Sequence, residues 1–524
     1  MKYLILILVM LSLLVGCNND SSTNPENQSY DSFDDLDIPD NFNYVTTNTI
    51  ELDIWSGLKS TVVITDNEGT EYFSSLTSDT GNMSRTITIP STVSELRFNY
   101  LDEDYSYAIN PSTSTLEVDL YTVLEDDEKG PSYNRHRSRV IPILEGIIHE
   151  DDGTITAHWG YNNQHSTTKS ESIGGKNKFS GRGLTAPDDD QGQPTTFLPG
   201  RQVDVFNMNF TPDGNHEIKW KVDIGGKVEA KAKASSPEMP EIDNDGDGVI
   251  DEDDTYPNDE YRAYDVFYPS EDTYGTLAYE DLWPALGDYD FNDLVVKYNF
   301  KEVHNAYNEV VDIIGSLKLV AIGASKQNGF FIQLPFFVED VTLVESNIEG
   351  AAISMEIISY DELAILQVFN NSNDVIQLNG DFMNTVEAEQ TYPEVEMTFT
   401  INVSNSDEIS DLLFTAPYNP YITIDHDITR EVHLPGLPPT MSADTSIFGS
   451  ADDATDIDNG YYYKTAEGIP WALNVSTSIA HSIEHADIIK AYPNFIQWVQ
   501  SNGTNNLDWF NFPVNEKIYK NLNK

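Results

Sequence analysis

Basic residues are scarce in this sequence. The 524 residues include 29 lysines and arginines against 87 aspartates and glutamates, so the formal net charge is −58. A chain this acidic repels polyphosphates and anionic headgroups, which argues against nucleic acid or an anionic membrane surface as a partner. The charge instead favours solubility in a salty extracellular medium.

Cysteine and long hydrophobic runs are also scarce. The one cysteine, Cys17, follows a short basic start (Met1–Tyr3) and an apolar run (Leu4–Val15) that is too short to span a bilayer. This arrangement resembles a bacterial lipoprotein signal, in which Cys17 is lipidated and becomes the mature N-terminus. The resemblance implies a cell-envelope protein, at the outer membrane or the cell surface, that contacts the membrane through its lipid. An ordinary cleaved signal peptide is the alternative.

Composition divides the chain after the signal (1–17) into further segments. Residues 18–41 are rich in Asn, Ser, Asp and Pro, which predicts a flexible tether. Residues 42–124 and 140–235 consist of short alternating runs separated by Gly and Asn/Asp turns, so each predicts a small antiparallel β-sandwich. A linker, 125–139, carries the only basic cluster and joins the two modules.

The remainder is predicted to be a hinge, 236–262, followed by one large domain, 263–524. Most of this domain reads as strands, such as GFFIQLPFFV and VEMTFTINV. Apolar residues between Ile488 and Val499 fall on one helical face, with Pro493 as a kink and Asn502-Gly503 as the stop. The predicted fold class is therefore mainly β, with two sandwich modules before a larger β-rich domain that ends in a helix.

The hinge contains DNDGDGVIDEDD, whose spacing matches an EF-hand-like calcium loop. In that pattern Gly248 permits the bend, Val249 offers its carbonyl, and Ile250 is expected to anchor the loop to a core. The predicted ligands are Asp243, Asp245, Asp247, Val249, Asp251 and Asp254. Because Asp stands where an EF-hand has Glu, the loop is more like a thrombospondin type-3 unit, with an expected affinity on the order of 0.1 to 1 mM. A solvated acidic linker is the alternative.

A second acidic segment, EDLWPALGDYDFND, lies about thirty residues further on. Alternation within its turn is expected to send the acidic side chains to one face and Tyr289, Phe291 and Leu294 to the other. Its predicted calcium ligands are Glu280, Asp281, Asp288, Asp290, Asn292 and Asp293. An Asx-rich turn that only caps backbone groups is the alternative. With one cysteine no intramolecular disulfide can form, so bound calcium is the remaining cross-link for these loops.

The same segment carries a family resemblance. Glu280–Pro284 followed by Gly287–Val296 is similar to the opening of the LruC domain of bacterial surface lipoproteins. Later phrases agree in order: YNPYI near Tyr418, REVHLPGLPPT around His433, and YYYKTAEGIPWALNV around Trp471. The resemblance covers about half the chain. It implies a cell-surface lipoprotein in which a calcium loop is a common neighbour of the domain, and it assigns no reaction.

Two enzyme hypotheses compete with a binding role. His481-Ser482-Ile483-Glu484-His485 spells HxxEH, the inverted zinc-protease motif, although only 39 residues follow it. A two-carboxylate glycosidase is the other, but so acidic a chain does not single out a pair. The run from Asp452 to Asp458 is a candidate third calcium loop.

We therefore expect a calcium-stabilised, lipid-anchored adhesion or ligand-binding protein, and binding is favoured over catalysis. A polysaccharide or protein ligand is anticipated, and polysaccharide is favoured because exposed Tyr and Trp suit sugar faces. A surface hydrolase acting on polysaccharide or peptide is the alternative function.

Overall fold

The computed structural model describes most of the chain from Tyr30 to Lys520. The described ranges are 30–56, 60–78, 81–100, 103–120, 138–150, 153–165, 167–182, 184, 190–214, 216–236, 243–251, 253–406 and 415–520. The predicted signal with Cys17, the first part of the predicted tether, and Arg135–Arg137 of the basic cluster lie outside these ranges. No described helix is long and apolar enough to cross a membrane.

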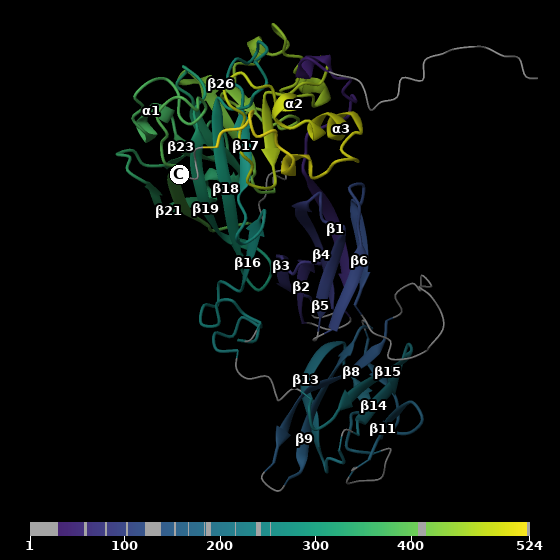
Figure 1. Ribbon diagram of the computed structural model, residues 1–524. Coiled ribbons are helices and arrows are strands. Elements are labelled where there is room, and N and C mark those ends of the chain that lie inside the picture. Colours follow the sequence, from purple (N-terminus) through teal and green to yellow (C-terminus); the bar gives the residue numbers. More distant parts are fainter. Residues whose placement is uncertain are drawn as a thin grey trace, which may run out of the picture.

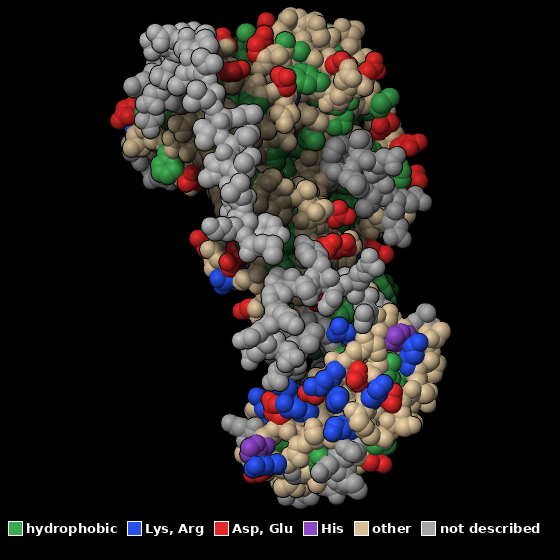
Figure 2. Space-filling model, turned by 90° about the vertical axis from the view of Figure 1, so that its right-hand side faces the viewer, with side chains coloured by type: hydrophobic (Ala, Val, Ile, Leu, Met, Phe, Trp, Pro, Cys, Tyr) green, Lys and Arg blue, Asp and Glu red, His purple; other side chains and the backbone are tan. Residues whose placement is uncertain are grey.

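The fold class is confirmed: the protein is mainly β, with several antiparallel sheets and a few short helices near its C-terminal end. Figure 1 shows the C-terminal domain at the top, the first sandwich below its helical end, and the second sandwich at the bottom, where Figure 2 shows Lys and Arg side chains gathered in blue.

The first module is a sandwich of two sheets, ordered β4-β1-β7 and β3-β2-β5-β6. Its strands are β1 (Thr47–Trp55), β2 (Thr61–Asp66), β3 (Glu71–Leu76), β4 (Asn82–Pro90), β5 (Glu95–Tyr100), β6 (Glu103–Ala108) and β7 (Thr115–Asp119). Along β1, buried Ile50, Leu52 and Ile54 alternate with exposed residues, as a half-buried strand requires. One pairing departs from the antiparallel prediction, because β1 and β7 run parallel.

The second module contains the sheets β13-β9-β8 and β11-β14-β15 with the short pair β10-β12. Its strands are β8 (Val140–His149), β9 (Ile155–Asn163), β10 (Lys169–Ser170), β11 (Asn177–Ser180), β12 (Thr196–Phe197), β13 (Gly200–Phe210), β14 (Ile218–Asp223) and β15 (Lys227–Ala232). Trp159 and Trp220 meet edge to face in its core at 6.1 Å between ring centroids.

The C-terminal domain packs a seven-stranded sheet against a five-stranded sheet. The larger has the order β21-β24-β19-β18-β17-β27 with β16 also paired to β18, and the smaller β22-β23-β20-β25-β26. The strands are β16 (Tyr264–Tyr268), β17 (Gly275–Tyr279), β18 (Leu294–His304), β19 (Val310–Ala321), β20 (Gly329–Phe337), β21 (Val341–Ile348), β22 (Glu356–Ile358), β23 (Leu363–Phe369), β24 (Val395–Val403), β25 (Asn419–Ile424), β26 (Asp427–His433) and β27 (Ala472–Val475).

Three short helices complete this domain: α1 (Ser372–Val375), α2 (Ile488–Ala491) and α3 (Asn494–Gln500). The predicted C-terminal helix is thus two helices, and Pro493 separates them as the N-cap of α3. The predicted apolar face is buried, and Asn502 and Gly503 adopt the left-handed conformation just after α3 ends.

The predicted tether extends too far, because its described end is packed. Phe33, Leu36 and Ile38 are buried in one cluster with Phe495 and Trp498 of α3, and the purple N-terminal segment lies beside the helices in Figure 1. The backbone N–H of Phe33 donates to Asp487 at 2.8 Å. The few hydrophobic residues of an otherwise polar segment are therefore sufficient to dock it on the distant C-terminal helices.

Candidate metal centres

The first acidic loop brings three of its predicted ligands together. Asp243, Asp245 and Asp247 each offer a carboxylate oxygen, and these oxygens lie within 4.8 Å of one another. The turn is closed by Asp243, which accepts backbone hydrogen bonds from Gly246 at 2.6 Å and Gly248 at 3.1 Å. Both glycines have positive φ, +83° and +100°, which residues with a Cβ rarely adopt.

Asp254, the predicted last ligand, faces the same three carboxylates. It is 8% exposed, and its Oδ2 has no hydrogen-bond partner among the described residues. Burial, and then the charges of Asp247, Asp245 and Asp243, raise the pKa of this carboxyl to about 6. Asp251 is engaged differently, because it accepts hydrogen bonds from the backbone and side chain of Asn244 at 2.9 and 2.6 Å.

The anchor of this loop is Val249, where Ile250 was expected. Val249 is 1% exposed and clusters with Ala263, Tyr264 and Ala306 of the C-terminal domain, while Leu76 of β3 packs against the cluster. Ile250 is only partly buried. The bend at Gly248 turns Val249, the seventh residue of the loop, inward. The loop is therefore held where the first module meets the C-terminal domain.

The second acidic segment supplies two of the four side chains in a second possible metal-binding group. Asp288 and Asp290, between β17 and β18, lie with Glu484 and His485, between β27 and α2; one ligand atom from each falls within 4.8 Å of the others. His485 Nδ1 is 2.6 Å from Asp288 Oδ2, and the backbone N–H of His485 donates to Asp290 Oδ2 at 2.8 Å. We call these four residues the buried-turn cluster.

The interior of this cluster disfavours negative charge. Asp290 is 2% exposed, and burial followed by the nearby Asp288 charge raises its pKa to about 8. Burial likewise raises the pKa of Glu484. The hydrogen bond to Asp288 raises the pKa of His485, so its imidazolium form balances part of the charge.

Glu280 lies beneath the same turn. Its Oε1 accepts the backbone N–H of Phe291 at 2.7 Å, while Oε2 has no partner among the described residues and the residue is 1% exposed. Burial, and then the charges of Asp293, Asp290 and Asp288, hold its pKa well above the usual range. A Cβ at Gly287 would lie 1.8 Å from Glu280 Oε2, so only glycine fits there.

The other predicted ligands of this segment are placed differently. Asp281 accepts from Asn328 at 2.7 Å, lies 3.7 Å from the Lys326 ammonium, and is joined through its backbone N–H to Asp293 at 2.7 Å. These partners make Asp281 and Asp293 a structural pair outside the cluster. Asn292 donates to the Ser482 carbonyl at 3.2 Å, but its fully buried Oδ1 has no partner among the described residues.

The turn is not the extended alternation that the sequence suggested. Tyr289 and Phe291 have φ of +60° and +51°, and His485 across the cluster has +60°. Tyr289 and Phe291 nevertheless point into an apolar cluster, which they share with Phe33. Leu294 belongs to the other core, between the two sheets. Left-handed residues, which are uncommon outside glycine, thus replace regular pleating here.

The inverted zinc motif does not assemble. Residues 481–485 are not helical; His481 is buried, lies 2.6 Å through Nε2 from the Asn384 carbonyl, and stacks on Tyr519. His481 and His485 therefore do not join one group, although Glu484 and His485 join another. The run from Asp452 to Asp458 forms no third acidic group in the described chain. Asp452 and Asp453 instead accept backbone hydrogen bonds from Leu286 and Gly449.

Sequence reasoning missed the partnership between the turn and residues 484–485. The HxxEH motif was the available signal for Glu484 and His485, but it suggested a helix and a partnership with His481. About 195 residues separate Asp290 from His485, and hydrogen bonds between the two loops, from Asn292 to the Ser482 carbonyl and from the Ile488 N–H to the Tyr289 carbonyl, bring them together.

The fold and its acidic turns define a mainly β, multi-module protein. Residues 308–510 match a family model described as a domain of unknown function, DUF4842. No curated protein matches the chain. The chain is similar to a solved structure of a predicted lipoprotein from Bacteroides ovatus, with 13% identity, a TM-score of 0.39, and coverage of 74% of this chain and 100% of that one.

Proposed function

We propose that this chain is a calcium-stabilised protein of the bacterial cell envelope, lipid-anchored at Cys17, whose C-terminal domain is of the LruC type and binds an extracellular ligand. The observation that supports calcium best is Asp254, a buried carboxylate with one unpartnered oxygen that faces three more carboxylates. Clustered carboxylate oxygens are the ligands that Ca²⁺ prefers, and repulsion among them disfavours the loop without a cation.

Calcium at this loop would act on the junction between modules. Val249 joins the loop to residues of the C-terminal domain and to Leu76 of the first sandwich. Arg85 of β4 also donates to the Tyr307 carbonyl across the junction at 3.1 Å. An ion that fixes the loop would therefore fix the angle between the first module and the C-terminal domain.

Calcium titration of the full chain tests this part of the proposal. Asp245→Ala should remove one bound calcium. Asp53→Ala removes the same charge from an exposed position on β1 and should not change the stoichiometry. Calorimetry gives both stoichiometries. Equal calcium binding by the two variants would contradict the loop as the site.

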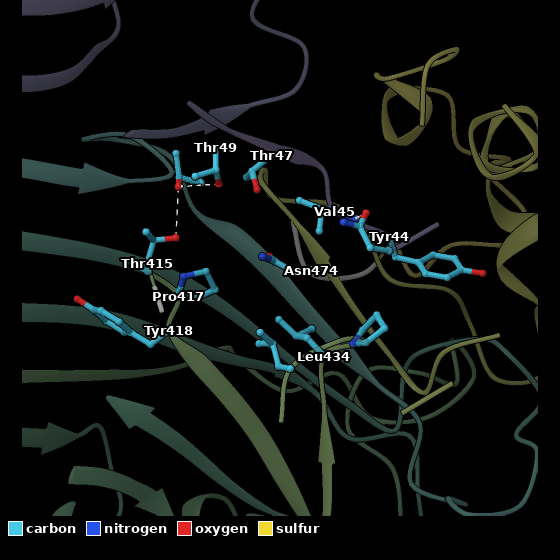
Figure 3. A pocket seen from close by; sticks show the side chains of 14 residues that line it. Tyr44, Val45, Thr47, Thr49, Thr415, Pro417, Tyr418, Leu434 and Asn474 are labelled. Atoms are coloured by element: carbon cyan, nitrogen blue, oxygen red, sulfur yellow. Dashed lines mark hydrogen bonds between the residues drawn. The ribbon is translucent and has the colours of Figure 1, made fainter. Parts of the chain in front are cut away.

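The ligand-binding part rests on a neutral cavity in an acidic protein. The cavity of about 240 Å³ lies between β1 and the C-terminal domain, and none of its lining residues is charged. Thr47, Thr49 and Asn474 face its middle in Figure 3, while the Tyr44 and Tyr418 rings point away. Hydroxyl and amide groups without charge suit an uncharged polar ligand such as a saccharide.

The tryptophans do not support this ligand as expected. Six of the seven are buried and Trp55 is partly buried, because indoles fill the cores of the modules. Among the described residues, the large exposed aromatic side chains are Tyr261, Tyr307 and Phe512, at 65%, 76% and 54% exposure. The saccharide proposal therefore depends on the cavity and not on an indole platform.

A glycan array probed with the calcium-loaded chain tests the ligand. Thr47→Arg should abolish retention by filling the cavity with a charge, and exposed Thr115→Arg on β7 serves as the matched control. Retained, unchanged glycan supports a binding module. Released products would instead support the hydrolase alternative, and equal binding by both variants would place the ligand elsewhere.

A further inference from the structure

We propose that the buried-turn cluster of Asp288, Asp290, Glu484 and His485 is a metal site for a divalent transition ion such as Zn²⁺ or Mn²⁺. The site is separate from the calcium loop and does not rest on it. Three carboxylates and one imidazole from two distant loops converge within 4.8 Å.

Two further side chains point to a cation rather than to a chance gathering of acids. Glu280 and Asn292 are 1% and 0% exposed, and each retains a buried oxygen with no hydrogen-bond partner among the described residues. Glu280 Oε1 accepts the backbone N–H of Phe291, the residue after Asp290, and the negative charges of Asp290 and Asp288 act on this carboxyl group. Buried oxygens without partners are energetically costly, and a cation in this turn would offset that cost.

Asn292 also connects the two loops directly. Its side-chain amide donates to Ser482, two residues before Glu484. Its Oδ1 packs against Gly323, where a Cβ would lie 1.8 Å away. The hydrogen bond to Ser482 therefore holds the turn against the loop that carries Glu484 and His485.

The donor set decides the class of metal. Ca²⁺ and Mg²⁺ take oxygen ligands, whereas imidazole nitrogen together with carboxylate suits Zn²⁺ and related first-row ions. His485 offers a largely exposed side chain, 80% accessible, so it can reorient to bind without disturbing the core. The imidazole donor therefore favours a transition ion at this segment, where the sequence predicted calcium.

A bound ion would join segments far apart in the chain. Asp288 and Asp290 precede β18 at the centre of the large sheet, whereas Glu484 and His485 precede α2, which carries the docked N-terminal segment. Metal binding would thus fasten the helical end of the domain, and the segment from Tyr30, to the sheet.

The test uses the full chain carrying Asp245→Ala, so that the calcium loop cannot contribute. Chelator-treated protein is titrated calorimetrically with Zn²⁺, Mn²⁺ and Ca²⁺. We expect one equivalent of a transition ion with an affinity at least about tenfold above that for Ca²⁺. His485→Gln should weaken that binding by about tenfold or more, and Asp290→Asn should abolish it. His149→Gln, an exposed histidine of the second module, is the matched control and should bind normally.

Cobalt provides a readout that does not depend on stability. The visible absorption of bound Co²⁺ reports nitrogen ligation, so His485→Gln should change the spectrum while circular dichroism stays that of the parent. Absence of a transition-ion equivalent, tighter binding of Ca²⁺ than of Zn²⁺, or a Co²⁺ spectrum unaffected by His485→Gln would each overturn the proposal. Because the calcium loop is disabled throughout, none of these outcomes bears on the calcium proposal.

Discussion

The two acidic groups are built from the same residue types but differ in burial. Asp243 is exposed and Asp245 and Asp247 are half-buried, whereas Asp290 and the adjacent Glu280 are 2% and 1% exposed. Water therefore screens repulsion at exposed Asp243 more than at buried Asp290. Correspondingly, the pKa of Asp254 is raised to about 6 and that of Asp290 to about 8. Burial, more than the number of acids, sets the free-energy cost of charge.

The two groups also differ in how they can relax. The loop from Asp243 is held mainly by its own turn hydrogen bonds and by Val249. Asp290 and Glu280 are fixed by backbone donors of His485 and Phe291, within a packed domain. Loss of metal should therefore loosen the first group locally, while the second remains in place and titrates.

The largest expected effect is that of Asp290→Asn in chelator. The folded pKa of about 8 exceeds the unfolded value, so Asp290 favours folding at low pH and this contribution is lost as pH rises from about 4 through 8. Over that window the wild type should lose about 5 kcal/mol of unfolding free energy through this group. Asp290→Asn, which is neutral throughout, should not lose it. Urea unfolding at pH 4 and 8, followed by tryptophan fluorescence, measures the difference.

Asp254→Asn is the matched comparison in the first acidic loop. Its window should run only from about pH 4 to 6, with a smaller loss of about 2 kcal/mol because the pKa of Asp254 is raised less than that of Asp290. Equal pH dependence in the two variants would show that burial does not distinguish the groups.

The next effect, that of His481, is a loss of stability at low pH instead of at high pH. Burial lowers the pKa of His481, near the buried-turn cluster, to about 4. Because this folded value lies below the unfolded one, the contribution is complete above about pH 6.5 and is lost as pH falls towards 4. The loss should reach about 3 kcal/mol. His481→Gln should remove it while still donating to the Asn384 carbonyl. Unfolding with saturating metal from pH 4 to 7 measures this, and an unchanged acid-side loss would contradict it.

Much of the fold was predictable from local pattern. Alternation in segments such as TIELDIW located the strands, and the apolar face from Ile488 located the helical end. The parallel partner of β1 was not predictable, because β7 lies about sixty residues away and pattern does not specify pairing. The docking of Phe33 was missed for the same reason: composition records how few hydrophobes a segment has, not what they contact.

The sites divide in the same way. Asp243, Asp245 and Asp247 converge through spacing within one turn, so the sequence was sufficient to predict them. Glu484 and His485 reach Asp290 through contacts between two loops far apart in the sequence, which no local motif encodes. Within the loop, spacing also left open which apolar residue points inward, and the structure assigns that role to Val249.

The smallest expected effect tests that assignment. Val249→Ala should cost about 2 kcal/mol, because it removes two buried methyl groups from the contact between the loop and its neighbours. The half-buried Ile250→Ala should cost less, although it removes more atoms. Calcium affinity should weaken with Val249→Ala, because the ion must then order a loop that has lost its anchor. Thermal unfolding with and without calcium, on both variants, measures the two effects. A larger loss from Ile250→Ala would return the anchor to the residue that the sequence suggested, and would mean that the loop does not couple the modules through Val249.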